Sequence, residues 1–282
     1  MFVADRLVYL QLQKTGCTHI AHILADFIDG KQIGKHNSLS STFTGKYIIG
    51  SIRNPWDWYV SLWAFGCGRK GGLYRRLTGI RHNFQWFTRK VLRNVLLTKR
   101  VPIGLIKDTI VASHQRPTSL WYSVYRDNMD AESFRAWLRL MFDPKRSADL
   151  GEKYARSSLN RFAGFFTYRY LKLYSRSVSP VLETNYFNCI NDLFEFDSQN
   201  NVLDSIIRME ALEDDLVLAL TNAGYPLTEE QKDKIHSGKN VKQNASKHQN
   251  ALFYYDQETI DLVAERERFI IKKYGYQLPS LC

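Results

Sequence analysis

Short apolar runs alternate with helix-like runs near the start of the chain, and this alternation constrains the possible fold more than any other feature. Residues 6–12 (RLVYLQL) and 46–52 (KYIIGSI) predict buried strands. Residues 18–28 predict a helix with Thr18 as its N-cap, and a second predicted helix has Asn54 as its N-cap. Because parallel strands need crossover connections, two successive strand–helix units predict an α/β fold with a central parallel sheet flanked by helices.

The rest of the chain predicts one more strand–helix unit and a helical insertion. Residues 204–210 predict a strand, followed by a helix that ends at Gly224, and a final single helix is expected to begin at Asp256. Residues 66–180 predict a largely helical insertion. Since no Pro-, Gly- or Ser-rich linker and no repeat divides the sequence, we expect residues 1–282 to form a single domain.

The charge of the chain favours an anionic partner. The 282 residues contain 39 Lys and Arg against 28 Asp and Glu, which gives a formal net charge of +11. Such an excess attracts nucleotides, nucleic acids, acidic saccharides or anionic membranes, and it does not choose among them. The basic residues are scattered rather than aligned on one helix face, so we do not expect nucleic-acid binding.

Composition also bears on location and on metal binding. The four cysteines (Cys17, Cys67, Cys189 and Cys282) are widely spaced, which is typical of free thiols in a reducing compartment. We find no signal-peptide pattern, and no apolar run approaches the roughly 20 residues of a membrane span, so a cytoplasmic protein without a transmembrane segment is expected. No His/Cys cluster has the spacing of metal ligands, and we expect no metal.

The loop between the first predicted strand and helix, QKTGCT at residues 13–18, is a candidate anion site. The first turn of a helix leaves N–H groups unpaired, and its dipole favours a negative charge. Gly16 lets the backbone approach a phosphate, and Lys14 supplies a mobile positive charge. Thr15 and Thr18 add hydroxyl donors. On this loop alone, an ordinary strand-to-helix turn with a surface lysine stays an equal alternative.

A second candidate loop follows the second predicted strand. Arg53 comes directly after that strand, and Ser61 lies eight residues later on the next helix. Open α/β sheets bind ligands at the carboxyl ends of their strands, and arginine pairs with phosphate in a bidentate manner. Two phosphate-competent loops at one sheet edge indicate a nucleotide with two separate phosphate groups.

Taken together, the two loops resemble those of the sulfotransferases. QKTGCTH (13–19) is similar to the 5′-phosphosulfate loop of that family, and RNPWDWYVSLW (53–63) to its 3′-phosphate motif. Residues 206–216 (IIRMEALEDDL) and 244–276 resemble further segments of bacterial members close to the carbohydrate-modifying branch, and the likeness covers about half of the chain. The resemblance implies a P-loop-like fold and 3′-phosphoadenosine 5′-phosphosulfate (PAPS) as the sulfate donor, with the desulfo nucleotide PAP as product.

The resemblance also implies roles for individual residues. Lys14 would stabilise the leaving phosphate oxygen, while Arg53 and Ser61 would hold the 3′-phosphate. The 5′-phosphate would be held by Thr15, Gly16, Cys17 (through its backbone) and Thr18. This sequence departs from the family pattern at Gln13, where a proline is usual, and at Cys17, which replaces a hydroxyl residue and removes one donor.

Two further assignments concern the general base and the loop that covers the bound donor. His36 in GKHNSL is the candidate base, since histidine titrates near neutrality and relatives carry a histidine segment at the corresponding place. A solvated loop histidine is the alternative. The basic loop of residues 238–250 resembles the segment that covers the donor in this family. That resemblance implies donor contacts from Lys242, Asn244, Ser246 and Lys247. A merely solvated loop is the alternative here too.

The acceptor and two rival functions stay open at this stage. We expect an acceptor with a free hydroxyl, of a carbohydrate or glycan and with an acidic saccharide as one candidate, because of the branch that the chain resembles. A small lipid or phenolic acceptor also fits the sequence. A P-loop nucleotide or nucleoside kinase is the rival enzyme, although the Gly-Lys-Ser/Thr ending is absent. A non-enzymatic basic module binding acidic saccharide or nucleic acid is the third alternative.

Overall fold

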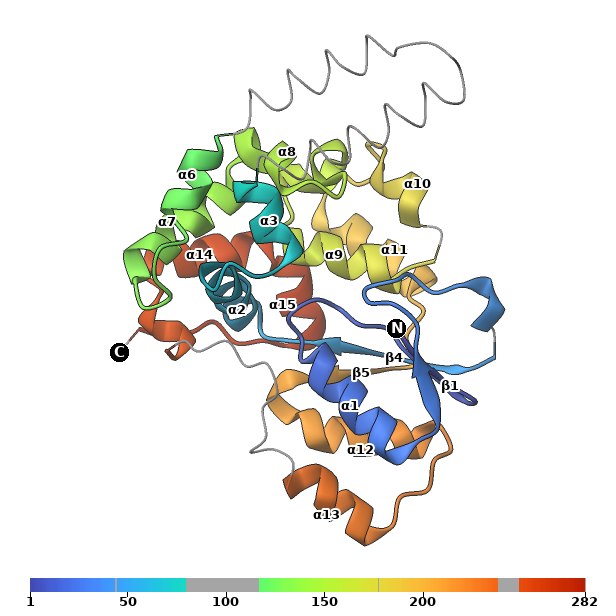
Figure 1. The fold of residues 1–282 in the computed structure, drawn as a ribbon. Helices are drawn as coiled ribbons and strands as arrows, with labels where there is room; N and C mark the ends of the chain where they lie inside the picture. Colours follow the sequence, from blue (N-terminus) through green and yellow to red (C-terminus); the bar gives the residue numbers. More distant parts are fainter. Residues whose placement is uncertain (44, 80–116, 177, 238–248, 282) are drawn as a thin grey trace, which may run out of the picture.

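The computed structural model describes all residues except 44, 80–116, 177, 238–248 and 282 (Figure 1). The four predicted donor contacts in the basic C-terminal loop therefore lie outside the described residues. So does part of the predicted helical insertion. Among the residues described, no helix has both the length and the apolar character needed to cross a membrane.

The sheet has five strands in the order β3-β1-β2-β4-β5. The last three strands in that order run parallel, with Tyr9 opposite Ile49 and Ile52 opposite Arg208. β1 pairs antiparallel with both β2 and β3. The strands are β1 (Phe2–Ala4), β2 (Leu7–Tyr9), β3 (Gly30–Gln32), β4 (Tyr47–Ile52) and β5 (Ser205–Arg208).

The α/β class is confirmed, and the predicted central parallel sheet is confirmed in part, because β2, β4 and β5 run parallel while β1 makes the sheet mixed. The predicted strand of residues 6–12 is only β2, which begins at Leu7 and ends at Tyr9. The chain turns back at residues 5–6, so the three residues of β1 pair with β2 as a hairpin. Strands this short carry too few residues for an alternating pattern to emerge from the sequence.

Side chains of the central strands alternate between two hydrophobic layers, as the two-residue period of a strand requires. Leu7, Tyr9 and Ile49 are buried in the layer that contains α1 (Cys17–Phe27) and α12 (Leu212–Asn222). Val8 and Ile48 belong to the layer on the other face. That layer contains α2 (Pro55–Cys67), α9 (Phe165–Tyr174) and the C-terminal helices (Figure 1).

The middle of the chain is largely helical where it is described, as predicted. Its α-helices are α3 (Gly72–Thr78), α6 (Thr118–Ser123), α7 (Ala131–Phe142), α8 (Ser147–Leu150), α9, α10 (Val178–Leu182) and α11 (Ile190–Asn200). Short 3₁₀ turns are η1 (Ser41–Phe43), η2 (Pro144–Arg146), η3 (Tyr154–Arg156), η4 (Ser158–Arg161), η5 (Met209–Ala211) and η7 (Ala251–Phe253). α13 (Glu229–Ser237) follows α12.

The predicted final helix is two helices, α14 (Gln257–Arg266) and α15 (Arg268–Tyr274). Asp256 caps α14 as predicted, accepting a hydrogen bond from Thr259 N at 2.9 Å. The break falls at Glu267, which is fully buried. Its carboxylate accepts hydrogen bonds from Thr167 N at 2.9 Å and Phe166 N at 3.2 Å, at the start of α9. Those contacts satisfy N–H groups that the first turn of α9 leaves unpaired, which explains why the helix is interrupted there.

Candidate functional site

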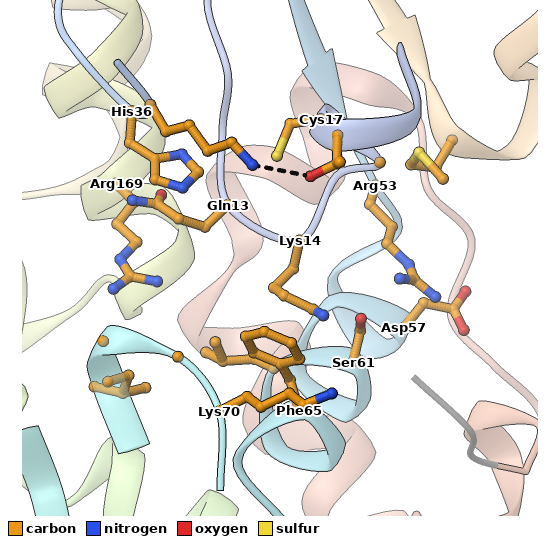
Figure 2. A pocket seen from close by; sticks show the side chains of 18 of the residues that line it. Gln13, Lys14, Cys17, His36, Arg53, Asp57, Ser61, Phe65, Lys70 and Arg169 are labelled. Atoms are coloured by element: carbon orange, nitrogen blue, oxygen red, sulfur yellow. Dashed lines mark hydrogen bonds between the residues drawn. The ribbon is translucent and has the colours of Figure 1, made fainter. Parts of the chain in front are cut away.

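A cavity of about 980 Å³ lies at the carboxyl ends of β2 and β4 (Figure 2). Its lining comes from the loop after β2, the residue after β4, the helix α2 and the loop after β3, together with parts of α3, α8, α9 and the segment that follows β5. The predicted site residues among its lining are Lys14, Gly16, Cys17, Thr18, His36, Arg53 and Ser61. Tertiary structure thus brings together residues that the sequence places in three separate segments.

The loop before α1 has an unusual backbone. Lys14 and Gly16 both have left-handed conformations, with φ of 65° and 69°. Turns of this kind bring successive N–H groups together into a concavity that suits an anion. α1 begins at Cys17 with Gly16 in the N-cap position, so the prediction of Thr18 as N-cap is wrong. The left-handed glycine turns the chain into the helix two residues earlier than a threonine cap would.

Thr15 does not direct its hydroxyl into the cavity. The side chain is fully buried, and the hydroxyl donates to Leu12 O at 2.9 Å and bonds Ser51 Oγ at 2.6 Å. These contacts tie the loop to β4. Thr15 can therefore serve a ligand through its backbone N–H alone. The Thr18 hydroxyl lies at the cavity and accepts a hydrogen bond from Lys35 Nζ at 3.4 Å.

A side chain at Gly16 would have to displace Met209 as well as strain the backbone. A Cβ there would lie 2.3 Å from Met209 Sδ. Gly275 has the same φ of 69° but nothing within 4 Å of its Cβ position. We predict that Gly16→Ala lowers the free energy of unfolding by about 2–4 kcal/mol and Gly275→Ala by about 1 kcal/mol, since only the first combines backbone strain with overpacking. Urea titration of both variants measures the difference, and equal losses would show that Met209 moves aside freely.

Lys14 is a cation without a close carboxylate. No carboxylate of the described residues lies within 4.0 Å of its amine, which sits 4.2 Å from the centre of the Phe65 ring. Burial, together with the nearby charge of Arg53, lowers the pKa of the Lys14 amine to about 8. A half-buried ammonium that lacks a counter-ion is stabilised when an anion arrives, and a bound anion would raise that pKa again.

Arg53 and Ser61 occupy the neighbouring part of the cavity. Arg53 directly follows β4, and burial lowers the pKa of its guanidinium while Asp57 and Glu210 act in the opposite direction. Asn54 caps α2 as predicted, accepting from Trp56 N at 3.0 Å, and so fixes where Ser61 lies on that helix. Ser61 is only 3% exposed and lines the cavity. Figure 2 shows Lys14 and Ser61 facing the same space, with Arg53 beside Asp57.

His36 reaches the cavity from the loop that follows β3. Its Nδ1 lies 2.7 Å from Gln11 O, which can only accept, so Nδ1 carries the proton of the neutral ring and Nε2 carries the lone pair. The carbonyl belongs to a buried glutamine whose amide pairs with Gln32 at 2.8 and 3.0 Å. His36 is an exposed residue, but partial desolvation of its ring lowers its pKa, while the Gln11 hydrogen bond raises it and the charge of Arg169 lowers it. At neutral pH the free Nε2 can therefore accept a proton.

The cavity is also lined by residues that were not assigned to the site from the sequence, among them Asp57, Glu210 and Arg169. Glu210 accepts a hydrogen bond from Asn54 N at 2.6 Å and so holds the turn that follows Arg53. Arg169 lies on α9 within an aromatic helix, where nothing in the local sequence distinguishes it from a surface arginine.

Cys17 lines the cavity as a buried thiol, and burial raises its pKa, so it is neutral at physiological pH. Within the described part of the chain, no group of three or more His, Cys, Asp or Glu side chains is arranged to hold a metal ion.

No family model, no curated protein and no solved structure matches this chain. The functional interpretation therefore depends on the motifs of the sequence and on the geometry of the cavity.

Proposed function

We propose that this chain is a PAPS-dependent sulfotransferase of P-loop-like fold, which transfers the sulfuryl group to a hydroxyl of a carbohydrate or glycan. The observation that carries the proposal is the single cavity shared by Lys14, Arg53, Ser61 and His36. A donor with two separate phosphate groups needs two cationic positions at one sheet edge. An acceptor hydroxyl needs a neutral base beside them.

The proposed reaction is an in-line displacement. His36 Nε2 takes the proton of the acceptor hydroxyl while that oxygen forms a bond to sulfur. The bond between sulfur and the bridging phosphate oxygen breaks, and its electron pair stays on that oxygen, so the products are a sulfate ester, PAP and a proton held by His36. Lys14 stabilises the negative charge that builds on the departing oxygen.

The two ends of the donor are assigned by the elements that line the cavity. The backbone N–H groups of residues 15–18, at the start of α1, hold the 5′-phosphate. Arg53 and Ser61, which both line the cavity, hold the 3′-phosphate through a guanidinium and a hydroxyl. The acceptor enters beside His36, where α3 and the turn after α8 contribute Tyr74 and Glu152 to the wall.

Nucleotide binding tests this proposal against its two rivals. In a thermal-shift experiment we expect PAP to stabilise the chain strongly, by about 2.7 kcal/mol at one hundred times its Kd, and ATP with magnesium to have little effect. Stabilisation by ATP in place of PAP would favour the kinase. Stabilisation by neither nucleotide, with binding of acidic saccharide or nucleic acid, would favour the basic module.

Arg53→Gln tests the 3′-phosphate assignment directly. Charge-assisted hydrogen bonds contribute about 1.5–3 kcal/mol, so we expect the Kd for PAP to rise about 10- to 100-fold. The Kd for adenosine 5′-monophosphate, which lacks the 3′-phosphate, should change little. Calorimetric titration of both ligands into both proteins measures this, and an equal loss for the two nucleotides would contradict the assignment.

A further inference from the structure

We infer that Arg169 binds an anionic group of the acceptor, and that this group is the carboxylate of a uronic-acid-type saccharide. The inference rests on the proposed function and specifies its acceptor. It assigns a binding role to a residue of α9 that neither anion loop of the sequence includes. Contacts, charge and position each support it.

The guanidinium of Arg169 is fixed by an ion pair and an aromatic ring, but some of its N–H donors have no hydrogen-bond partner among the described residues. Its side chain is 7% exposed and lines the cavity, and its guanidinium carbon lies 4.3 Å from the centre of the Phe165 ring. Nη2 donates to Glu152 Oε1 at 2.6 Å. Nε is buried without a partner, and Nη1 makes no hydrogen bond with any described residue. Because an arginine offers five N–H donors, this one keeps donors for a ligand.

Arg169 shares its carboxylate partner, Glu152, with a second cation. Glu152 also accepts from Lys172 Nζ at 3.2 Å, so one carboxylate serves two cations. Burial would raise the pKa of Glu152, but the charges of Arg169 and Lys172 hold it at about 2, and the carboxylate stays ionised. Buried charges need partners, and an incoming anion would provide the missing one.

The position of Arg169 fits the acceptor rather than the donor. In Figure 2, Arg169 and His36 lie on one side of Lys14, while Arg53 lies on the other. The charge of Arg169 reaches the His36 ring, since it lowers the pKa of that histidine. Because Arg169 and His36 lie on the same side of Lys14, a sugar whose carboxylate pairs with Arg169 would lie on the His36 side of the cavity. The planar carboxylate matches the planar fork of the guanidinium.

Arg169→Gln and Lys172→Gln form a matched pair for testing this inference. Each removes one positive charge from the same Glu152 carboxylate, but Lys172 is not among the residues that line the cavity. The probes are an oligosaccharide of hexuronate units and the same oligosaccharide with its carboxylates converted to amides. Transfer from labelled PAPS is measured for both.

We expect the unsubstituted chain and Lys172→Gln to prefer the carboxylate form. In Arg169→Gln the KM for that form should rise about 10- to 100-fold, with the amide form and the calorimetric Kd for PAP unchanged. Arg169→Lys keeps the positive charge but loses the planar guanidinium, so its KM for the carboxylate form should lie between those of the unsubstituted chain and Arg169→Gln. Equal use of both saccharides, or a preference that survives Arg169→Gln, would overturn the inference. An Arg169-dependent preference for sulfate esters over carboxylates would overturn the choice of carboxylate.

The same proteins separate failure of this inference from failure of the proposed function. Calorimetric titration of the hexuronate oligosaccharide needs no transfer and can be done with and without PAP. Binding of PAP without any binding of the oligosaccharide would overturn the role of Arg169 and leave the donor assignment intact. Conversely, oligosaccharide binding that Arg169→Gln abolishes and Lys172→Gln preserves would support the anion site even if PAP did not bind.

Discussion

Lys14→Met is expected to lower kcat for sulfuryl transfer at least 10²- to 10³-fold, about the loss seen when a group that stabilises transition-state charge is removed. Methionine keeps an unbranched side chain beside the Phe65 ring. At this left-handed backbone position it is strained to the same degree as lysine, so packing and backbone strain change little. The ammonium alone is lost. Because its charge matters most as the phosphate oxygen departs, kcat should fall much more than PAP affinity.

Lys31→Met provides the control for this experiment. Lys31 is an exposed lysine of β3 that does not line the site cavity, so its loss changes the net charge equally. Single-turnover kinetics and calorimetry with PAP, applied to both variants, separate chemistry from binding. A Lys14→Met protein that transfers sulfate at the normal rate would contradict the role of Lys14.

His36→Ala is expected to lower kcat about 10²- to 10⁴-fold, the usual contribution of a general base, with little change in the Kd for PAP. The matched control is His22→Ala, which removes an exposed histidine of α1 outside the cavity. If the imidazole acts as the base, its loss should also be partly repaired by added imidazole. Full turnover in the His36 variant would move the base elsewhere.

The pH dependence of kcat/KM gives a second measurement for the same residues. The pKa of His36 is lowered, so the rate should rise with pH on a limb centred below 6.5, where the base loses its proton. The pKa of Lys14 is about 8, so the rate should fall again above that pH as the ammonium is lost. His36→Ala should abolish the acidic limb and keep the alkaline one. An unchanged acidic limb would show that another group titrates.

Local sequence predicted the parts of the fold that depend on neighbouring residues. β4, the cap of α2 at Asn54 and the cap of α14 at Asp256 all lie where they were predicted. The predictions failed where distant contacts override local preference. Glu267 divides the last helix because its carboxylate is drawn to the N-terminus of α9, about one hundred positions earlier in the chain. β1 joined the sheet through a hairpin too short to detect.

The features of the candidate site also fall into two groups, those that local sequence predicts and those that depend on contacts between distant segments. By itself, the sequence determined two loops with cationic side chains at strand ends, because each loop is a short continuous segment with its own helix start. Only the tertiary structure decided that the Thr15 hydroxyl is buried against Ser51, that His36 is fixed by Gln11, and that Arg169 faces the same cavity. Those outcomes depend on packing and hydrogen bonds between segments far apart in the chain, and no local pattern of residue types encodes them.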